Sequence, residues 1–383
     1  MRILIHTPDF PPCDGGISTV AYEYARTFHD HGHEVLVITP SPCYDMGEWD
    51  SKQRFALNRI SNIKAFALKY YYQLFQLRKV LSKKRFDLLI SQRWNVSGLI
   101  CEKARNSFSI PHYQWFHGNE IYDRHLSQKR WERLFRTAIT NADLNIMVSS
   151  FTERKLRDRV HLPLRSQVIY SGVDVNKFVP AGNQEMIKSQ LGFSGRYVLL
   201  TLGRLVARKG QDQVIQALPK IVPNIPNILY VIAGKGKYEE HLKSLVRSLA
   251  LEKHVYFTGF ITEEQKLSYY QMCDQYLMPS REIEDEGDIE GFGLTFLEAN
   301  ACGKPVIAGA SGGCTEAVKE NVNGLIINPL DTDAISASVL KLYDPDFYSK
   351  LSTSAISYVN EHLSWDRSAQ TVIECLTQNK DKE

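Results

Sequence analysis

Two carboxylates and two glycines stand close together in the segment Glu290-Gly291-Phe292-Gly293-Leu294-Thr295-Phe296-Leu297-Glu298. The glycines predict a turn, and a helix is expected from about Phe292–Leu294 onward, with free N–H groups that attract an anion. Glu290 precedes this helix and Glu298 lies about two turns inside it. Charged carboxylates accept strong hydrogen bonds from hydroxyl groups, so the pair fits the hydroxyls of a sugar and of a ribose. A helix-capping glutamate plus a surface glutamate is the alternative, and it explains both residues together less well.

A second cluster of charges is the segment Gly203-Arg204-Leu205-Val206-Ala207-Arg208-Lys209-Gly210, between an apolar run and a helix. Arg204 and Lys209 lie five residues apart on the predicted turn. An arginine offers bidentate hydrogen bonds and a lysine a mobile point charge, so the two can converge on a diphosphate. A solvated basic turn is the alternative. The position at the carboxyl end of a predicted strand, where α/β sheets bind ligands, favours the phosphate site.

A glycine pair, Gly15-Gly16, follows the first apolar run and precedes another helix. Glycines at such a turn let backbone N–H groups approach a phosphate, but by themselves they fit a plain turn equally well. Their spacing is not the GxGxxG of a dinucleotide site, and no GxxxxGK[ST] occurs. The missing GxGxxG disfavours a nicotinamide-dependent dehydrogenase.

Short apolar runs alternate with amphipathic stretches along the chain, the pattern of parallel strands joined by helices. Pro180 and Gly182 interrupt the pattern between two such series. We therefore expect two doubly wound α/β domains, the first over 1–178 and the second over 179–363. Three helical stretches follow Asp331 without a strand, the last over about 364–377. The expected strands are Arg2–Thr7, Glu34–Thr39, Phe86–Ser91, His112–Phe116, Leu144–Val148, Val168–Ser171, Tyr197–Leu202, Ile228–Ala233, Val255–Thr258, Gln275–Met278, Pro305–Ala308 and Leu325–Ile327.

Composition narrows the class of protein. The chain has 383 residues, of which 43% are hydrophobic and 23% charged, which excludes collagen-like, disordered and small disulfide-bonded proteins. Its seven cysteines are never spaced as CxxC, so we expect neither disulfides nor a zinc site, and a reducing, cytoplasmic location. No run approaches the roughly 18 apolar residues of a membrane span.

The net charge of +3 is unevenly distributed. Ten basic residues and no acidic ones lie in 51–86, whereas acidic residues gather in the loop 282–288, for which we have no expected role. A basic aromatic helix in 51–86 would suit an anionic membrane surface or a polyprenyl diphosphate, and a helix with its aromatics in the core is the open alternative. No nucleic-acid-binding module accompanies the charge. The aromatic residues at helical spacing are Phe66, Tyr70, Tyr71, Tyr72 and Phe75.

Together the motifs GGxST, GRLxxxKG and EGFGLTFLEANACGKPVIA resemble those of the retaining glycosyltransferases of family 4. The resemblance extends through Ser171-Gly172-Val173-Asp174, Pro279-Ser280-Arg281 and Asn323-Gly324-Leu325, and so covers nearly the whole chain. It implies the GT-B fold, in which two Rossmann-like domains face each other. It also implies that the last helix, about 364–383, crosses back to the first domain.

The resemblance also implies roles for individual residues. Arg204 and Lys209 would hold the donor pyrophosphate together with Gly16, and Lys266 would approach the phosphates. Glu298 would bind the ribose hydroxyls. The remaining implied contacts are with the base, by Ile261, and with the donor sugar, by Glu290, the backbone of Phe292, Gly293 and Leu294, and His117 from the first domain.

The expected activity is retaining transfer of a hexose, from GDP-mannose, UDP-glucose or a UDP-N-acetylhexosamine. The acceptor would be a glycan or a polyprenyl-diphosphate-linked molecule in cell-surface polysaccharide or glycolipid synthesis, and no motif marks its binding residues. No Asp-x-Asp motif follows a predicted strand, so we expect neither a metal nor another cofactor. The alternatives are a nucleotide-sugar epimerase or hydrolase of the same fold, and a regulator that binds nucleotide sugars without catalysis.

Overall fold

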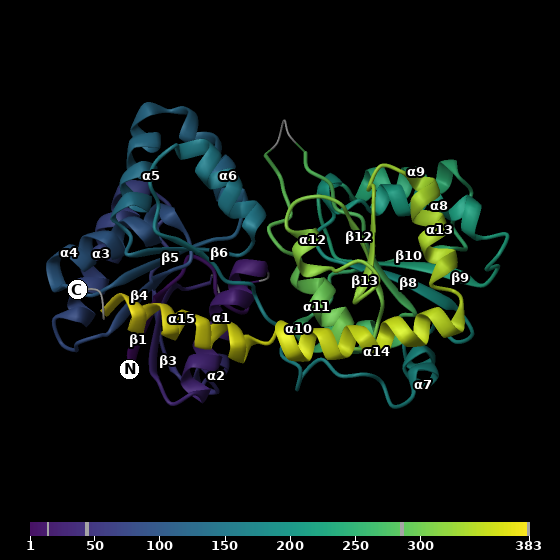
Figure 1. The fold of residues 1–383 in the computed structure, drawn as a ribbon, viewed down its shortest axis with the longest axis horizontal. Helices are drawn as coiled ribbons and strands as arrows, with labels where there is room; N and C mark the ends of the chain where they lie inside the picture. Colours follow the sequence, from purple (N-terminus) through teal and green to yellow (C-terminus); the bar gives the residue numbers. More distant parts are fainter. Residues whose placement is uncertain (14, 43–45, 284–286, 381–383) are drawn as a thin grey trace. The chain divides into compact units, whose positions relative to one another are not determined.

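The computed structural model describes residues 1–13, 15–42, 46–283 and 287–380, and contains two parallel β-sheets covered by helices (Figure 1). Contacts divide the chain into a first unit, Met1–Ser171 with Trp365–Glu383, and a second unit, Gly172–Ser364. The domain boundary expected at 178–179 lies in an irregular segment of the second unit and stays a prediction. In the described part of the chain, no helix is both long and apolar enough to cross a bilayer.

The first unit contains a seven-stranded sheet in the order β3-β2-β1-β4-β5-β6-β7. Strand β1 pairs on both sides, with β2 and β4, and its apolar side chains are buried because helices cover both faces of the sheet. The order reverses between β1 and β4, where doubly wound sheets bind ligands beyond the strand ends. The elements are β1 (Arg2–His6), α1 (Gly16–Asp30), β2 (Glu34–Pro40), α2 (Gly47–Ser51), β3 (Ala56–Ile60), α3 (Phe66–Leu81), β4 (Leu88–Ser91), η1 (Trp94–Gly98), α4 (Leu99–Phe108), β5 (His112–Phe116), η2 (Asn119–Tyr122), η3 (Arg124–Ser127), α5 (Lys129–Asn141), β6 (Leu144–Met147), α6 (Ser150–Val160) and β7 (Ser166–Val168).

The basic segment 51–86 is not one helix, which corrects the sequence expectation. Its first part forms the edge strand β3, with Leu57 opposite Val37 of β2. Arg59 of this strand is held by Asp50 at 2.8 Å, so one of the ten basic residues is an ion-pair partner. Apart from Ser51 at the end of α2, only α3 is helical in this segment. The edge strand was missed because it is short and carries polar residues that pair only in the folded sheet.

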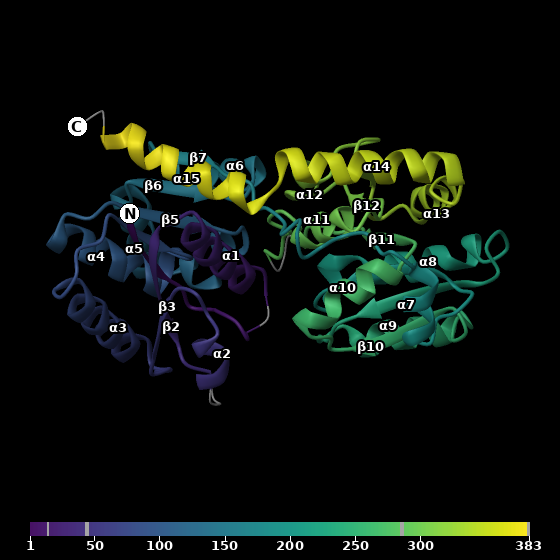
Figure 2. The same cartoon turned by 90° about the horizontal axis from the view of Figure 1, so that it is seen from below.

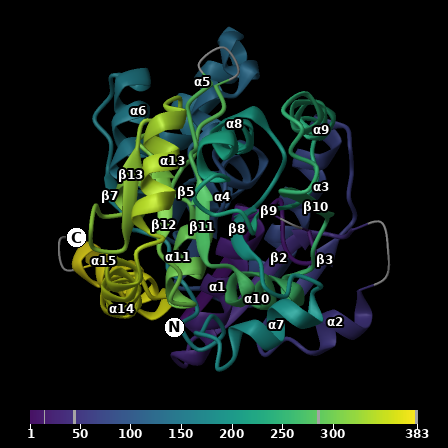
Figure 3. The ribbon, with the colours of Figure 1, turned by 90° about the vertical axis from the view of Figure 1, so that its right-hand side faces the viewer.

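The second unit contains a six-stranded parallel sheet in the order β10-β9-β8-β11-β12-β13, and Figure 3 shows these strands side by side. Helix α14 packs against α11, as Figure 2 shows. The elements are α7 (Gln184–Gln190), β8 (Tyr197–Leu202), η4 (Ala207–Lys209), α8 (Gln211–Ile221), β9 (Ile228–Ala233), α9 (Glu239–Ser248), β10 (Val255–Gly259), α10 (Glu263–Met272), β11 (Gln275–Met278), α11 (Leu294–Ala301), β12 (Val306–Gly309), α12 (Cys314–Ala317), β13 (Gly324–Ile327), α13 (Thr332–Lys341) and α14 (Pro345–His362).

The last helix, α15 (Trp365–Lys380), packs on α1 of the first unit, which confirms the expected crossing (Figure 1). The Trp365 ring lies 5.5 Å from the Tyr24 ring, and the hydroxyl groups of Tyr24 and Ser368 are 2.6 Å apart. The apolar stripe of α15 is buried at helical spacing and would otherwise face water. Its buried members are Trp365, Ala369, Val372 and Leu376.

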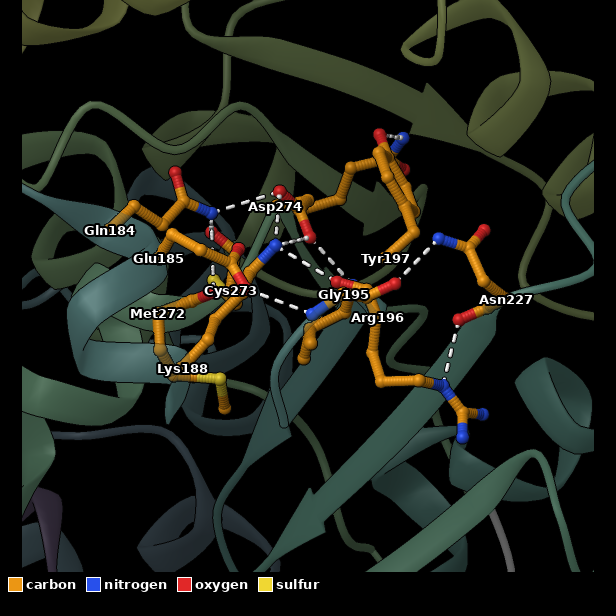
Figure 4. A network of polar contacts seen from close by, with 12 residues as sticks. Gln184, Glu185, Lys188, Gly195, Arg196, Tyr197, Asn227, Met272, Cys273 and Asp274 are labelled. Carbon is orange, nitrogen blue, oxygen red and sulfur yellow. Dashed lines mark hydrogen bonds and ion pairs between the residues drawn. The ribbon is translucent and has the colours of Figure 1, made fainter. Parts of the chain in front are cut away.

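A polar network holds the amino-terminal ends of the strands in the second unit (Figure 4). Lys188 of α7 forms a nearly buried ion pair of 2.8 Å with Asp274, whose carboxylate also accepts from the Val198 N–H at 2.6 Å. Gln184 donates to the same carboxylate. Ligands of parallel sheets bind at the opposite, carboxyl ends of the strands. The network therefore stabilises the sheet and lies away from the candidate site.

Histidines in the interior of the first unit predict acid sensitivity. His6 and His112 are fully buried, each within 2.9 Å of a serine hydroxyl, and burial lowers the pKa of each to about 3. The unfolded chain takes up these protons below a pKa of about 6.5, whereas the folded unit does not, so stability is complete above that pH and falls as pH falls. The pKa of His117 in the same unit is lowered to about 3 in the same way, so we expect the three histidines to cost the unit about 2.4 kcal/mol of unfolding free energy between pH 7.5 and 6.0.

Urea unfolding followed by tryptophan fluorescence measures this loss, because all five tryptophans belong to the first unit. His112→Gln should remove about one third of the pH dependence, because it removes one of the three histidines. As the control, His362→Gln replaces an exposed histidine of the second unit and should change nothing. An unfolding free energy that is equal at the two pH values would contradict the prediction.

Candidate functional site

The charged side chains of the basic turn after β8 differ in their exposure to solvent. Gly203 and Gly210 have φ of +150° and +74°, and a Cβ on Gly210 would lie 2.1 Å from the Pro279 carbonyl oxygen, so this position requires glycine. With this backbone, Lys209 is buried and Arg204 is exposed. Among the described residues Arg204 forms no ion pair. The two residues predicted to share a diphosphate therefore differ in their exposure to solvent.

Lys209 instead meets Glu290 in a nearly buried cluster of charges. The Lys209 Nζ lies 2.7 Å from the Glu290 carboxylate, which also forms an ion pair with Arg208. Arg208 bridges to Asp288 at 2.9 Å, and its side chain is only 4% exposed. Burial by itself would raise the pKa of Glu290, but the charges of Lys209 and Arg208 outweigh it and lower the pKa to about 2. Glu290 is thus an anion with two fixed cationic partners.

Arg208 is a member of this cluster to which sequence reasoning assigned no role. Burial lowers its pKa and the carboxylates of Glu290 and Asp288 raise it, with a net rise. The sequence offered one signal for this role, because Arg208 lies beside Lys209 in the basic turn and the chain also contains the acidic loop 282–288. Of that acidic loop, residues 284–286 lie outside the described part of the chain. Asp288 now has a partner, so this part of the loop neutralises a buried arginine.

Helix α11 begins at Leu294, after Gly293 with φ of +104°. Glu298 is therefore just over one turn inside the helix, instead of the expected two turns. Its side chain is buried and accepts a hydrogen bond of 2.6 Å from the Tyr270 hydroxyl. Burial raises the pKa of the Glu298 carboxyl. Phe292 and Gly293 are buried at the start of this helix and Leu294 is half-buried, so the backbone N–H groups of the first turn mark one edge of the site.

The other predicted donor contacts of the second unit lie on α10 and just before it. Ile261 is buried immediately before Thr262, which caps this helix. Lys266 forms an ion pair with Glu263, and its charge also acts on the Glu298 carboxyl. The unit thus brings Lys266 into the electrostatic range of Glu298 and Lys209 into contact with Glu290.

The predicted residues of the first unit lie after β1 and β5. Gly16 is exposed at the first position of α1, which has no side-chain cap and no acidic residue in its first turn, so its N–H groups suit an anion. The His117 Nε2 lies 3.0 Å from the Gln92 Oε1, and its backbone N–H donates to Glu120 at 2.7 Å. Burial of the ring lowers the pKa of His117 to about 3, so the imidazole is neutral. Gln92 and Glu120 had no sequence signal of their own.

Family models cover both halves of the chain. A model described as Glycosyltransferase Family 4 matches residues 14–177, and one described as Glycosyl transferases group 1 matches residues 183–359. The two matches contain every residue predicted for the site. Each half therefore has the sequence pattern of the corresponding half of these enzymes.

Known proteins resemble the chain over its full length. A GDP-mannose-dependent alpha-(1-6)-phosphatidylinositol monomannoside mannosyltransferase of Mycolicibacterium smegmatis is 28% identical, over 98% of both chains. The crystal structure of Anabaena HepE with UDP-glucose has a TM-score of 0.82 at 21% identity, covering 99% of this chain and 100% of that one. Sucrose-phosphate synthase of Thermosynechococcus elongatus has a TM-score of 0.82 at 20% identity and covers 100% of both chains. At these identities the two structures support the GT-B fold.

Proposed function

Because the chain belongs to the family 4 glycosyltransferases, retaining enzymes that transfer a sugar from a nucleotide sugar, we propose that it transfers mannose from GDP-mannose to a glycan or lipid-linked acceptor. The product would be a cell-surface polysaccharide or glycolipid. One observation carries this proposal: Lys209 and Glu290 form an ion pair just before the start of α11, and Glu298 is buried within that helix. The M. smegmatis mannosyltransferase, which depends on GDP-mannose and is 28% identical to this chain, supports the choice of donor.

In the proposed reaction, the bond between the anomeric carbon and the diphosphate oxygen breaks, and a bond to the acceptor oxygen forms on the same face. The departing phosphate oxygen takes the acceptor proton. Lys209, the exposed Arg204 and the first turn of α11 would stabilise the negative charge that develops on the diphosphate. These fixed charges would make a divalent metal unnecessary. Lys266 and the start of α1 at Gly16 would add to the positive potential.

Glu290 would orient the sugar and support positive charge on its ring, without acting as nucleophile or general base. Its pKa of about 2 keeps it ionised at neutral pH. Glu298 would accept hydrogen bonds from the ribose hydroxyls, with Ile261 against the base. The neutral imidazole of His117 would donate to or accept from a sugar hydroxyl.

A thermal-shift series with GDP-mannose, UDP-glucose, UDP-N-acetylglucosamine and ADP-glucose tests the donor. We expect GDP-mannose to raise the melting temperature most, because a ligand that binds only the folded protein stabilises it. The shift and the turnover should persist in EDTA. Incubation without acceptor separates the alternatives, because an epimerase would convert the sugar and a hydrolase would release it. Binding without any product in the presence of lipid-linked acceptors would support a regulator and contradict the transferase.

We also propose that α3 attaches the enzyme to the cytoplasmic face of an anionic membrane. Its exposed face carries Leu68, Tyr71 and Phe75, which are 65%, 69% and 62% exposed and lie on one side of the helix. Basic residues flank this stripe, and such a helix binds anionic lipid surfaces. Co-sedimentation should occur with phosphatidylglycerol vesicles and decrease with salt and in Leu68→Ser. Equal sedimentation with phosphatidylcholine would contradict the proposal.

A further inference from the structure

A nearly buried ion pair joins the segment after β11 to the start of α8. The Arg281 guanidinium donates to both carboxylate oxygens of Asp212, at 2.9 and 2.7 Å, and the two side chains are only 13% and 6% exposed. The Tyr238 hydroxyl also donates to this carboxylate, at 3.2 Å. A bidentate contact of this kind fixes the orientation of its partners as well as their distance. None of the donor contacts predicted above includes any of these three residues.

The basic turn after β8 is attached to the same segment through its backbone. The Arg281 backbone N–H donates to the Arg208 carbonyl oxygen at 2.9 Å. At Gly210 the turn packs so closely on this segment that a Cβ would lie 2.1 Å from a carbonyl oxygen. Asp212 follows two residues later, in the first turn of α8. Contacts at three alternate positions therefore fix the backbone on both sides of Lys209.

The chain that leaves Arg281 leads to Glu290. Ile283 and Asp288 exchange backbone hydrogen bonds of 3.1 and 3.3 Å, so the two sides of the loop between them are paired. Asp288 in turn holds the Arg208 side chain at 2.9 Å. Glu290 follows two residues after Asp288. A displacement of Arg281 would therefore move this loop, and Glu290 with it, relative to the basic turn.

The proposed reaction requires this backbone to stay in place. Lys209 pairs with Glu290 in the structure, and it would contact the diphosphate of a bound donor. Its ammonium group ends a flexible four-carbon side chain, so the exchange of partners is precise only if the backbone at both residues is fixed. A misplacement of about 1 Å at a reacting centre can lower a rate by about 10²-fold.

We propose that Arg281 is a positioning residue of the transferase, which holds the turn of Lys209 and the loop of Glu290 in one register. Its backbone N–H and its guanidinium contact the turn, and the chain that follows it carries Glu290. Asp212 is its partner in this role, and the Tyr238 hydroxyl orients the Asp212 carboxylate. The inference rests on the roles proposed above for Lys209 and Glu290. It adds residues that act through them and touch no substrate.

The double variant Asp212→Leu/Arg281→Met tests the proposal, because replacing a buried ion pair by apolar side chains is often neutral for stability. We expect a melting temperature close to that of the wild-type chain. In the same variant kcat should fall about 10–100-fold, and titration calorimetry should show about tenfold weaker binding of GDP-mannose and of inorganic pyrophosphate. Arg281→Lys keeps the charge without the bidentate contact and should retain more of kcat.

The matched control is Lys220→Met/Asp333→Leu, which removes an exposed ion pair between α8 and α13. It should leave kcat and both affinities unchanged, because exposed pairs contribute little. A second comparison uses the Glu290→Gln background, where removing the buried pair should cost less of kcat, since the position of an absent carboxylate no longer affects the rate. A merely structural role would give the same loss in both backgrounds.

The inference is overturned if the folded double variant keeps the wild-type kcat and pyrophosphate affinity, or if its loss of kcat is equal with Glu290 and with glutamine at that position. A wild-type chain that binds pyrophosphate but neither binds nor turns over GDP-mannose refutes the proposed donor alone. In that case weaker binding of pyrophosphate by the double variant still supports the role of Arg281, and unchanged binding refutes it.

Discussion

Replacing Glu290 with glutamine is expected to lower kcat by about 10²–10³-fold, the usual effect of removing one electrostatic contact to a transition state. The carboxylate is ionised, and two cations hold it at the start of α11. Glutamine keeps the shape and removes the charge that would support an oxocarbenium-like sugar. Steady-state kinetics with GDP-mannose measures the effect, and we expect KM to change less than kcat.

The control for this variant is Glu252→Gln, the same substitution at an exposed position of the second unit. It should leave kcat unchanged. A melting curve of Glu290→Gln separates a catalytic effect from unfolding, because Lys209 and Arg208 lose their shared acid. Near wild-type turnover in a folded Glu290→Gln enzyme would show that the carboxylate has no role in transfer.

Replacing Arg208 with methionine is expected to destabilise the second unit by about 3–5 kcal/mol, because it leaves buried carboxylates without their cation. Asp288 loses its 2.9 Å contact, and Glu290 keeps only Lys209. We further expect Lys209 to be held more tightly by Glu290 and to be less available to a diphosphate. Calorimetry gives the stability, and titration of GDP-mannose gives the weaker donor affinity.

Arg208→Lys should restore only part of the stability, because a lysine is a single point charge and cannot bridge both carboxylates as a guanidinium does. Arg247→Met, at an exposed position of α9, is the matched control and should have little effect. In the double variant Arg208→Met/Glu290→Gln the losses should not add, since the residues are in contact. Additive losses would mean that the ion pair does not couple them.

Most of the architecture was predictable because the apolar runs are buried on both faces and are therefore continuous in sequence. The expected strand Tyr197–Leu202 coincides with β8, and Gln275–Met278 coincides with β11. The GT-B fold class and the crossing of the last helix are confirmed. The edge strand β3 was missed, because its polar residues find partners only in the assembled sheet.

Some features of the site could likewise be predicted from the sequence, and others could not. The turn at Gly210 could be predicted from the sequence, because glycine is the residue that most easily adopts the left-handed backbone found there. The structure adds that a side chain at this position would collide with Pro279. The direction of a side chain on a turn cannot be predicted from the sequence in this way. In the structure, Arg208 and Lys209 contact Glu290, whereas Arg204 is exposed to solvent. The roles of the predicted donor contacts stay predictions.

The sequence alone therefore determined the order of the strands and helices apart from β3, the family and the positions of the glycine turns, since each of these depends on neighbours along the chain. The tertiary structure determined which charges meet and where a cavity forms. Lys69, Arg93 and Trp131 come from α3, from the turn after β4 and from α5, and only the packing of the first unit brings them to one wall. Contacts between residues far apart in sequence arise from packing, which no local pattern encodes.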